Sequence, residues 1–534
     1  MEEKTEYTTY TTTTTTTTTT THQNSSEMSD SKTEHEVVLN EKIDQMSHHS
    51  ASAHGNAAAM EKGQETNEEY DEHGNQINFV MSETEIKLVR KLDFMYVMPY
   101  IAVLNFLQFF DKSALNYSAV LGIRETASLD LKQFSWLGSI FYLGYLLFQG
   151  PSMILIQKMR LRMYIGTVII LWGVVLLLTF LGHNFSQLAA LRFLLGFFEG
   201  GIYPCCIMLI SSLYRRKEQA GRIGVVYICN GIALSFGGLI GYGIGNMDGA
   251  GGLRAWQWIM IILGAITILF GIVSFLFMVD NPKSKVLCLS SEEEKIVDAR
   301  MRDNAVVRSK EIKMSHIYES LKEPRFYIFC LCSMLINFQN SVLNTYSSLI
   351  TKGFGFTSLN AILLTIPSGV TDCLFIVIAV WYNRRYGNTL YGACAFLFVA
   401  IIGILLLVVI PVAKAKLLGL YLTWAYAAGY VLLLVSVANN VAGYTKKIFY
   451  SSSIMVFYTF GNFIGPFFMV ESQAPLFVGG MVGCMVANAA TIVLFIYARW
   501  DMARENRKRM ANHVEMEVTP DMTDVENRNF IYRL

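Results

Sequence analysis

The sequence predicts an all-α membrane protein in which twelve transmembrane helices form two bundles of six. Hydrophobic residues make up 53% of the 534 residues and charged residues only 16%, against roughly 45–50% and 25% in soluble domains. Uncharged runs of at least 23 residues recur along the chain, and a helix needs about 20 mostly apolar residues to cross a bilayer. A long charged connection at 280–325 separates the first six spans from the last six.

The predicted spans and their connections also give an orientation. Nine spans lie in runs free of Asp, Glu, Lys and Arg: 133–157, 163–191, 223–247, 255–279, 326–351, 386–413, 417–445, 448–470 and 472–498. Three further apolar segments contain charges: 94–118, 186–214 and 357–382. The loops after spans two, four, eight and ten carry eleven Lys and Arg residues, and the loops on the other side carry six. Because this excess marks the cytoplasmic side, both termini are predicted to be cytoplasmic.

Charge and composition divide the chain into five segments. We expect a disordered acidic cytoplasmic tail, an N-terminal six-helix bundle, a cytoplasmic linker, a C-terminal six-helix bundle and a cytoplasmic C-terminal tail, at 1–88, 89–279, 280–325, 326–500 and 501–534. Residues 1–80 contain fifteen Asp and Glu against four Lys and Arg, with an unbroken threonine run from Thr11 to Thr21, so no hydrophobic core can form there. The charge pattern gives no support for a nucleic-acid partner, and the nine cysteines form neither a disulfide framework nor a zinc spacing.

Four ionisable residues inside predicted spans are the first candidate site. Asp111 and Lys112 are adjacent in span one, and Arg192 and Glu199 lie two helical turns apart in span four, about 10 Å along one helix face. Each costs about 2.5–3.5 kcal/mol to insert, so each indicates function by default. A carboxylate that takes up a proton would release a cation to bind an anion. The competing interpretation is a set of structural ion pairs between helices one and four.

Other polar residues in the spans are weaker candidates. Gln339 and Asn340 in span seven, and Asn462 in span eleven, could line a cavity or bridge helices. For Asp372 in span eight a structural or interfacial role is favoured. No metal site is predicted.

Glycines at four-residue spacing occur in two spans that correspond between the halves. Span five contains Gly237 and Gly241, and span eleven contains Gly461 and Gly465. Small residues at this spacing let helices approach closely. Static packing would explain them, and so would a surface on which the two halves rock.

Several motifs resemble one family. The span-four sequence Arg192-Phe-Leu-Leu-Gly-Phe-Phe-Glu199-Gly, twelve spans and the long central loop resemble the major facilitator superfamily, in its anion:cation symporter branch. Within that branch the chain is most similar to the fungal allantoate permease family, through Phe110-Asp111-Lys112, Gly443-Tyr-Thr-Lys-Lys447, Gly461-Asn-Phe-Ile-Gly-Pro466, Gln473-Ala-Pro475 and the tail from Met522 to Phe530.

The resemblance implies roles for residues already singled out. Asp111 and Glu199 match the branch's protonatable carboxylates, Lys112 and Arg192 its substrate-contacting cations, and Asn462 an amide near the pocket. Many relatives have arginine where this chain has Lys112, and a lysine offers a point charge rather than a planar fork.

Together these features predict a transporter rather than an enzyme. We expect a monomeric, proton-coupled secondary active transporter that imports a small organic anion across a fungal plasma membrane by alternating access. The anion would be a carboxylate such as a ureido acid, amino acid, small peptide or vitamin acid. The proton gradient would supply the energy, with no cofactor. The alternatives are a non-transporting nutrient sensor and a carrier of an internal membrane such as the vacuole.

Overall fold

The computed structural model describes residues 66–70, 76–80, 82–305, 313–412, 414–474, 476–511 and 521–534. Residues 87–534 belong to one compact unit, and the described residues before Lys87 belong to another. Within the larger unit the first six predicted spans correspond to α3 (Val97–Val120), α5 (Leu131–Lys158), α6 (Leu161–Leu178), α7 with α8 (Phe185–Glu199 and Ile202–Leu213), α9 (Arg216–Gly245) and α10 (Ala255–Phe277). The last six correspond to α13 (Pro324–Gly353), α14 with α15 (Ser358–Leu363 and Thr365–Tyr386), α16 (Thr389–Val409), α17 with α18 (Lys416–Thr423 and Ala425–Asn440), α19 (Tyr444–Ile464) and α20 (Val478–Ala511).

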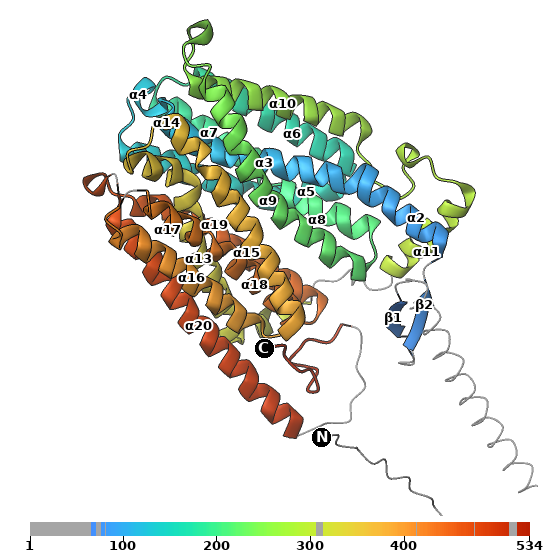
Figure 1. Ribbon diagram of the computed structural model, residues 1–534. Coiled ribbons are helices and arrows are strands. Elements are labelled where there is room, and N and C mark those ends of the chain that lie inside the picture. Colours follow the sequence, from blue (N-terminus) through green and yellow to red (C-terminus); the bar gives the residue numbers. More distant parts are fainter. Residues whose placement is uncertain are drawn as a thin grey trace, which may run out of the picture. The chain divides into compact units, whose positions relative to one another are not determined.

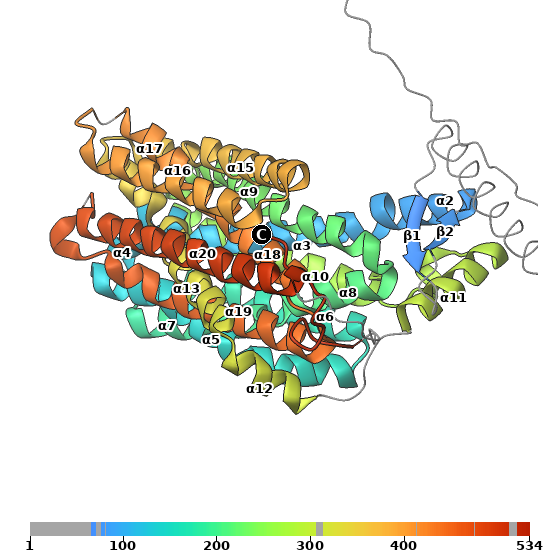
Figure 2. The ribbon, with the colours of Figure 1, turned by 90° about the horizontal axis from the view of Figure 1, so that it is seen from below.

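These helices confirm the predicted all-helical body (Figures 1 and 2). By length and composition, eleven helices in the described part of the chain could cross a membrane. The predicted eleventh span, α19, is not among them because its 21 residues include Lys446, Lys447 and several hydroxyl side chains. Helix α20 continues to Ala511, beyond the predicted end of span twelve, since a helix does not stop where its apolar part stops.

The region before the first span is only partly described. Most of the predicted disordered tail, residues 1–88, lies outside the described residues. Within it, β1 (Thr66–Tyr70) and β2 (Gln76–Val80) form an antiparallel pair, with Thr66 opposite Val80. Helix α2 (Glu83–Lys91) leads through a short π-helical turn, η1 (Leu92–Tyr96), into α3. The linker contains α11 (Ser291–Ala305) and α12 (Met314–Lys322).

The two halves of the helical unit touch at the end where α4 (Ile123–Thr126) and α14 lie (Figure 1). There Asn116 of α3 donates to Ser347 Oγ at 2.8 Å and accepts from the Ser348 backbone N–H at 2.9 Å. The hydroxyls of Ser135 and Tyr346 are 2.7 Å apart. These contacts join α3 and α5 of one half to α13 of the other, so they close this end of the space between the halves.

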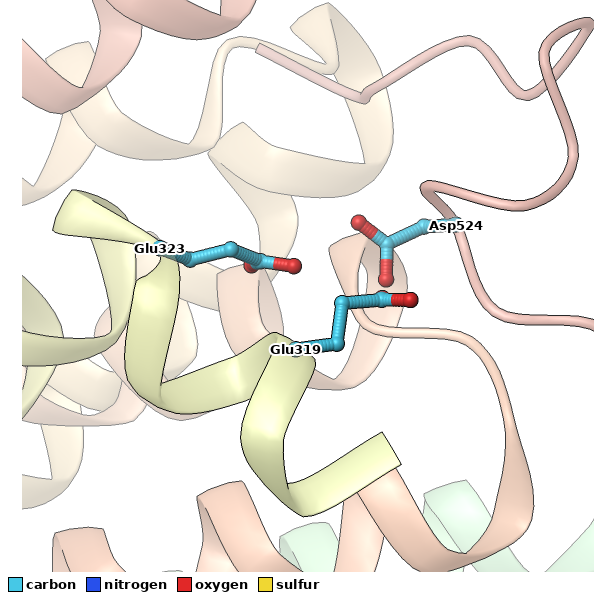
Figure 3. Close-up of side chains that lie close together, drawn as sticks. All are labelled: Glu319, Glu323 and Asp524. Atoms are coloured by element: carbon cyan, nitrogen blue, oxygen red, sulfur yellow. The ribbon is translucent and has the colours of Figure 1, made fainter. Parts of the chain in front are cut away.

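The C-terminal segment 521–534 packs against the opposite end of the second half. Three carboxylates, from Glu319 of α12, Glu323 and Asp524, converge there (Figure 3). The ammonium of Lys446 is fully buried among them, 2.7 Å from Glu319 Oε1, 2.7 Å from Asp524 Oδ1 and paired with Glu323. The carboxylates therefore surround a lysine and hold α12, α19 and the C-terminal segment together. We call this set, Lys446 with Glu319, Glu323 and Asp524, the lysine cage.

Candidate functional site

A cavity of about 130 Å³ lies between the two halves. At about 30 Å³ per water molecule, that volume is enough for roughly four waters or one small organic molecule. Its lining is polar and aromatic and comes from both halves, and consists of Asn105, Gln108, Phe109, Lys112, Tyr145, Tyr203, Asn230, Asn337, Asn340, Asn344, Asp372, Ile376, Trp424, Tyr426, Ala427, Tyr430, Val431, Met455 and Tyr458. Such a mixture of convergent polar groups and aromatic walls is typical of ligand sites.

Lys112 is the predicted site cation that reaches this cavity. Its ammonium forms an ion pair with Glu199 of α7, and it lies 5.8 Å from the ring centroid of Phe141. The Lys112 side chain keeps 17% of its surface exposed, whereas Glu199 keeps none. Gln108, which also lines the cavity, lies near Glu199. The lysine therefore faces the cavity with its countercharge directly behind it.

Asp111 and Arg192 form a second layer behind the cavity wall. Asp111 is fully buried and accepts a hydrogen bond of 2.8 Å from Trp172 Nε1. Arg192 interacts electrostatically with Asp111 and Glu199. Within the described part of the chain, Asp111 Oδ1 and Arg192 Nη2 lack hydrogen-bond partners. Neither residue lines the cavity in this conformation, and direct contact of Arg192 with a ligand stays a prediction.

The predicted amides occupy different places. Asn340 lines the cavity, accepts a hydrogen bond of 2.6 Å from the Tyr426 hydroxyl and donates to Asn462 Oδ1 at 2.8 Å. Asn462 is buried and outside the cavity lining, so it supports Asn340 from behind. Gln339 points elsewhere, because consecutive residues on a helix project about 100° apart. It donates to the Thr423 carbonyl at 2.7 Å and accepts from Asn488, inside its own bundle. Gln339 therefore lies outside the cavity lining in this conformation, and its contact with a ligand stays a prediction.

Three residues line the cavity although no ligand-binding role was predicted for them. Asn105 and Gln108 lie on the same stripe of α3 as Lys112, at offsets of seven and four residues, and this helical spacing was a usable signal. Asp372 of α15, for which a structural role was favoured, also lines the cavity.

Comparison with known proteins decides the family. The sequence pattern of the Major Facilitator Superfamily matches residues 101–469. The chain belongs to the major facilitator superfamily. It is 30% identical over 477 residues to the allantoate permease of Saccharomyces cerevisiae, covering 85% of this chain and 88% of that protein. It is 28% identical to the thiamine pathway transporter THI73 of the same yeast, over 89% of this chain and 91% of that protein. An uncharacterized transporter of Schizosaccharomyces pombe is 32% identical, over 84% and 92%.

Solved structures of this superfamily share the fold. A bacterial homolog of the human lysosomal transporter Spinster, in an inward-facing and occupied conformation, matches with a TM-score of 0.57 at 15% identity, over 75% of this chain and 94% of that one. A D-xylose-proton symporter matches with a TM-score of 0.55 at 15% identity, over 74% and 95%. The chain is thus a multi-pass membrane protein of a transporter family, as the motifs predicted.

The glycines predicted from their four-residue spacing lie at close helix contacts, three of them within one half. A Cβ on Gly461 or Gly465 would meet the carbonyl oxygen of Met334 or Phe338 of α13 at 2.3 Å or 2.6 Å, within one half. A Cβ on Gly237 would lie 3.1 Å from Phe110, also within one half.

Contacts between the halves form on other positions of α9. A Cβ on Gly241 would lie 3.2 Å from Tyr117 and 3.3 Å from Ile362 of the other half. A tight approach is at Gly231, where a Cβ would lie 2.6 Å from Cys373 Sγ and 2.8 Å from the Gly369 carbonyl oxygen of α15. Gly231, which was not singled out from the sequence, therefore marks a close contact of α9 with α15.

Alanine at Gly231 tests whether this contact matters. We expect Gly231→Ala to lower thermal stability by about 1–3 kcal/mol through overpacking. The control is Gly243→Ala in the same helix, where a Cβ meets nothing within 4 Å and alanine improves helix propensity by about 1 kcal/mol. Thermal unfolding of the two purified variants measures the difference. Equal melting temperatures would show that α9 and α15 are not held this closely.

Proposed function

We propose that this protein is a proton-coupled secondary active transporter that imports a small organic anion. The observation that carries the proposal is the buried ion pair of Lys112 and Glu199 at the wall of a cavity between the halves. The relatives' names support a solute transporter, including an allantoate permease. The proposed location is the plasma membrane, with both termini cytoplasmic and a monomer as the working unit.

The ion pair links proton binding to anion binding. When Glu199 is ionised, Lys112 is neutralised by it and offers little to an incoming carboxylate. When Glu199 binds a proton, Lys112 loses its countercharge, and a ligand carboxylate entering the cavity restores it. A buried cation without a partner is costly, which disfavours the protonated, anion-free state. Two carboxylates that share one cation repel each other, which disfavours the ionised, anion-bound state. Proton and anion therefore bind together and leave together.

The second layer would tune this exchange. Asp111 and Arg192 sit behind the pair and interact electrostatically with it. Their partly unsatisfied polar atoms leave room for rearrangement when Glu199 changes charge. In this proposal Asp111 is a second proton-coupling carboxylate and Arg192 stabilises the loaded site through its positive charge.

Alternating access would require the contacts between the two halves at the α4 and α14 end to open. The hydrogen bonds of Asn116 with α13 and of Ser135 with Tyr346 close the end that the positive-inside rule places outside the cell. Their opening, with closure of the opposite end, would expose the same cavity alternately to each side. No cofactor enters this mechanism, and the energy comes from the proton gradient.

Uptake into proteoliposomes tests the proposal. The purified protein, with a pH-sensitive dye inside and an acidic outside medium, is offered a panel of small carboxylates. We expect one class to enter against its gradient while protons enter with it. Entry without proton movement would overturn the symport mechanism. Binding without entry would favour the sensor, and activity found only in vacuolar membranes of the native cell would favour the internal-membrane carrier.

A further inference from the structure

Asp372 is a buried carboxylate in the cavity wall, on the half opposite the one that carries Lys112. It belongs to α15, is 3% exposed and lines the same cavity as Lys112 of α3. Within the described residues, its Oδ1 has no hydrogen-bond partner and its carboxylate forms no ion pair. A buried carboxylate without a partner is costly in its charged form. A proton would remove that charge.

The side chains of α15 and α9 around Asp372 supply no cation. A Cβ on Gly231 of α9 would lie 3.0 Å from Asp372 Oδ2 and 2.6 Å from the sulfur of Cys373. The titratable groups here are therefore two thiols, that of Cys373 on α15 and that of Cys229 on α9, which lies near it. A thiol is neutral at physiological pH unless its pKa is lowered, so neither thiol balances a carboxylate.

The other helices packed against α15 supply no cation either. Tyr426 of α18 interacts electrostatically with Asp372, but its hydroxyl donates to Asn340. Helices α14 and α16 contain no charged residue, and Lys416 of α17 lies over the ring of Phe354. Across the cavity, the remaining titratable groups of the lining are Lys112, Tyr145, Tyr203, Tyr430 and Tyr458.

An anion in the cavity would change the charge that Asp372 meets. In the empty protein the countercharge of Lys112 is Glu199, which is fully buried behind it. A bound anion would take over this role from the front, so that its negative charge shares a cavity of about 130 Å³ with Asp372. Like charges this close repel, and a proton on Asp372 removes the repulsion. When the anion leaves, water that refills the cavity solvates the carboxylate and favours loss of the proton.

We propose that Asp372 is a further proton-binding residue, which takes up a proton when the anion enters the cavity and releases it when the anion leaves. This inference rests on the proposed function and adds one proton per anion to those carried in the first half by Glu199 and Asp111. With at least two protons for each monovalent anion, uptake moves net positive charge inward. A membrane potential that is negative inside then drives uptake, even without a pH gradient.

Accumulation in proteoliposomes under two separate gradients tests this. The probes are three labelled monovalent anions that cross lipid slowly: allantoate, gluconate and pantothenate. In one experiment the outside is one pH unit more acidic and the potential is clamped at zero. In the other the pH is equal and a potassium diffusion potential makes the inside negative. Each further proton per anion raises the accumulation reached at equilibrium by about tenfold for one pH unit, or for about 59 mV of potential.

The variant Asp372→Asn should carry one proton fewer per anion. The amide has the shape of a protonated carboxyl group but cannot release a proton. We therefore expect the variant to keep exchanging labelled for unlabelled anion, while it accumulates the anion about tenfold less than the native protein under either gradient. The control Glu125→Gln, at an exposed carboxylate on α4, should accumulate the anion as the native protein does.

The outcomes separate this inference from the proposed function. Equal accumulation by Asp372→Asn and the native protein overturns the inference, and so does a folded variant that no longer exchanges anion. The native protein gives a test that needs no variant. If a pH gradient drives its accumulation but the potential does not, one proton accompanies each anion, so the symport proposal stands and the inference falls. Failure to accumulate any of the three probes under either gradient overturns both.

Discussion

Replacing Lys112 by methionine is expected to abolish anion binding. Methionine preserves much of the side-chain length and apolar volume but removes the charge that faces the cavity. It also leaves Glu199, which is fully buried, without its ion-pair partner. Truncating one partner of a buried charge pair costs about 2–5 kcal/mol, which corresponds to a loss of affinity of roughly 30-fold to several thousand-fold. Titration of the purified variant with the best carboxylate measures this loss.

A second variant separates binding from folding. In Lys112→Met combined with Glu199→Gln no buried charge is left unpaired, so we expect most of the thermal stability lost by Lys112→Met alone to return. Anion binding should not return with it. If the double variant binds the anion as well as the native protein, the pair is structural and the cation of the site lies elsewhere. Lys112→Arg keeps the charge and should retain binding, with a changed preference because guanidinium binds carboxylates through two parallel hydrogen bonds.

Replacing Lys446 by methionine is expected to cause the largest loss of stability. The substitution leaves the three cage carboxylates, from Glu319, Glu323 and Asp524, facing one another without the ammonium between them. Removing one partner of a buried pair costs about 3–5 kcal/mol. The control is Lys447→Met, an exposed neighbour whose ammonium lies 3.1 Å from the Ala438 carbonyl oxygen, and we expect it to cost less than about 1 kcal/mol. Thermal unfolding of both variants measures the two costs.

The pH dependence of that stability follows from Asp524. Burial alone would raise the pKa of Asp524, but the charges of Lys446 and Arg325 outweigh burial and hold the pKa below its usual range. A carboxyl group with a lowered folded pKa stabilises the protein above its unfolded pKa, about 3.9. That stabilisation is lost as the pH falls through the folded pKa. The stabilisation that Asp524 gives the native protein should therefore stay constant from neutral pH to about pH 5 and fall only below about pH 4. Asp524→Asn, which cannot titrate, measures it by difference, and a difference in stability that changes between pH 7 and pH 5 would contradict the cage.

The helices could be predicted because the bilayer imposes long apolar segments on the sequence. Helix α19 shows the limit of that rule, since it carries Lys446, Tyr450 and Asn462 on its buried face. Hydropathy measures contact with lipid, and that face packs against other helices, chiefly α13. Its place in the count came from the uncharged run 448–470, which begins just after the two lysines.

The four charged residues could be found from the sequence, but their pairing could not. Spacing within span four suggested that Arg192 and Glu199 act together, whereas the structure joins Glu199 to Lys112 of another helix. Which residues of two helices meet depends on the rotation of each helix about its axis, and a single sequence does not fix that rotation. The same reason explains why Asn340 faces the cavity and its neighbour Gln339 does not. A structural or interfacial role was favoured for Asp372, because a single sequence does not show which side chains surround a carboxylate. The structure places Asp372 in the cavity lining.

The measurement that tests the central claim most directly compares net uptake with exchange in Glu199→Gln. Exchange of labelled for unlabelled anion across a vesicle membrane needs binding and alternating access but no net proton movement. If Glu199 carries the coupled proton, the glutamine variant should still exchange anion while losing accumulation driven by a pH gradient. The control Glu125→Gln should keep both. A Glu199→Gln variant that still accumulates the anion in response to acid outside, as steeply as the native protein, would contradict the account.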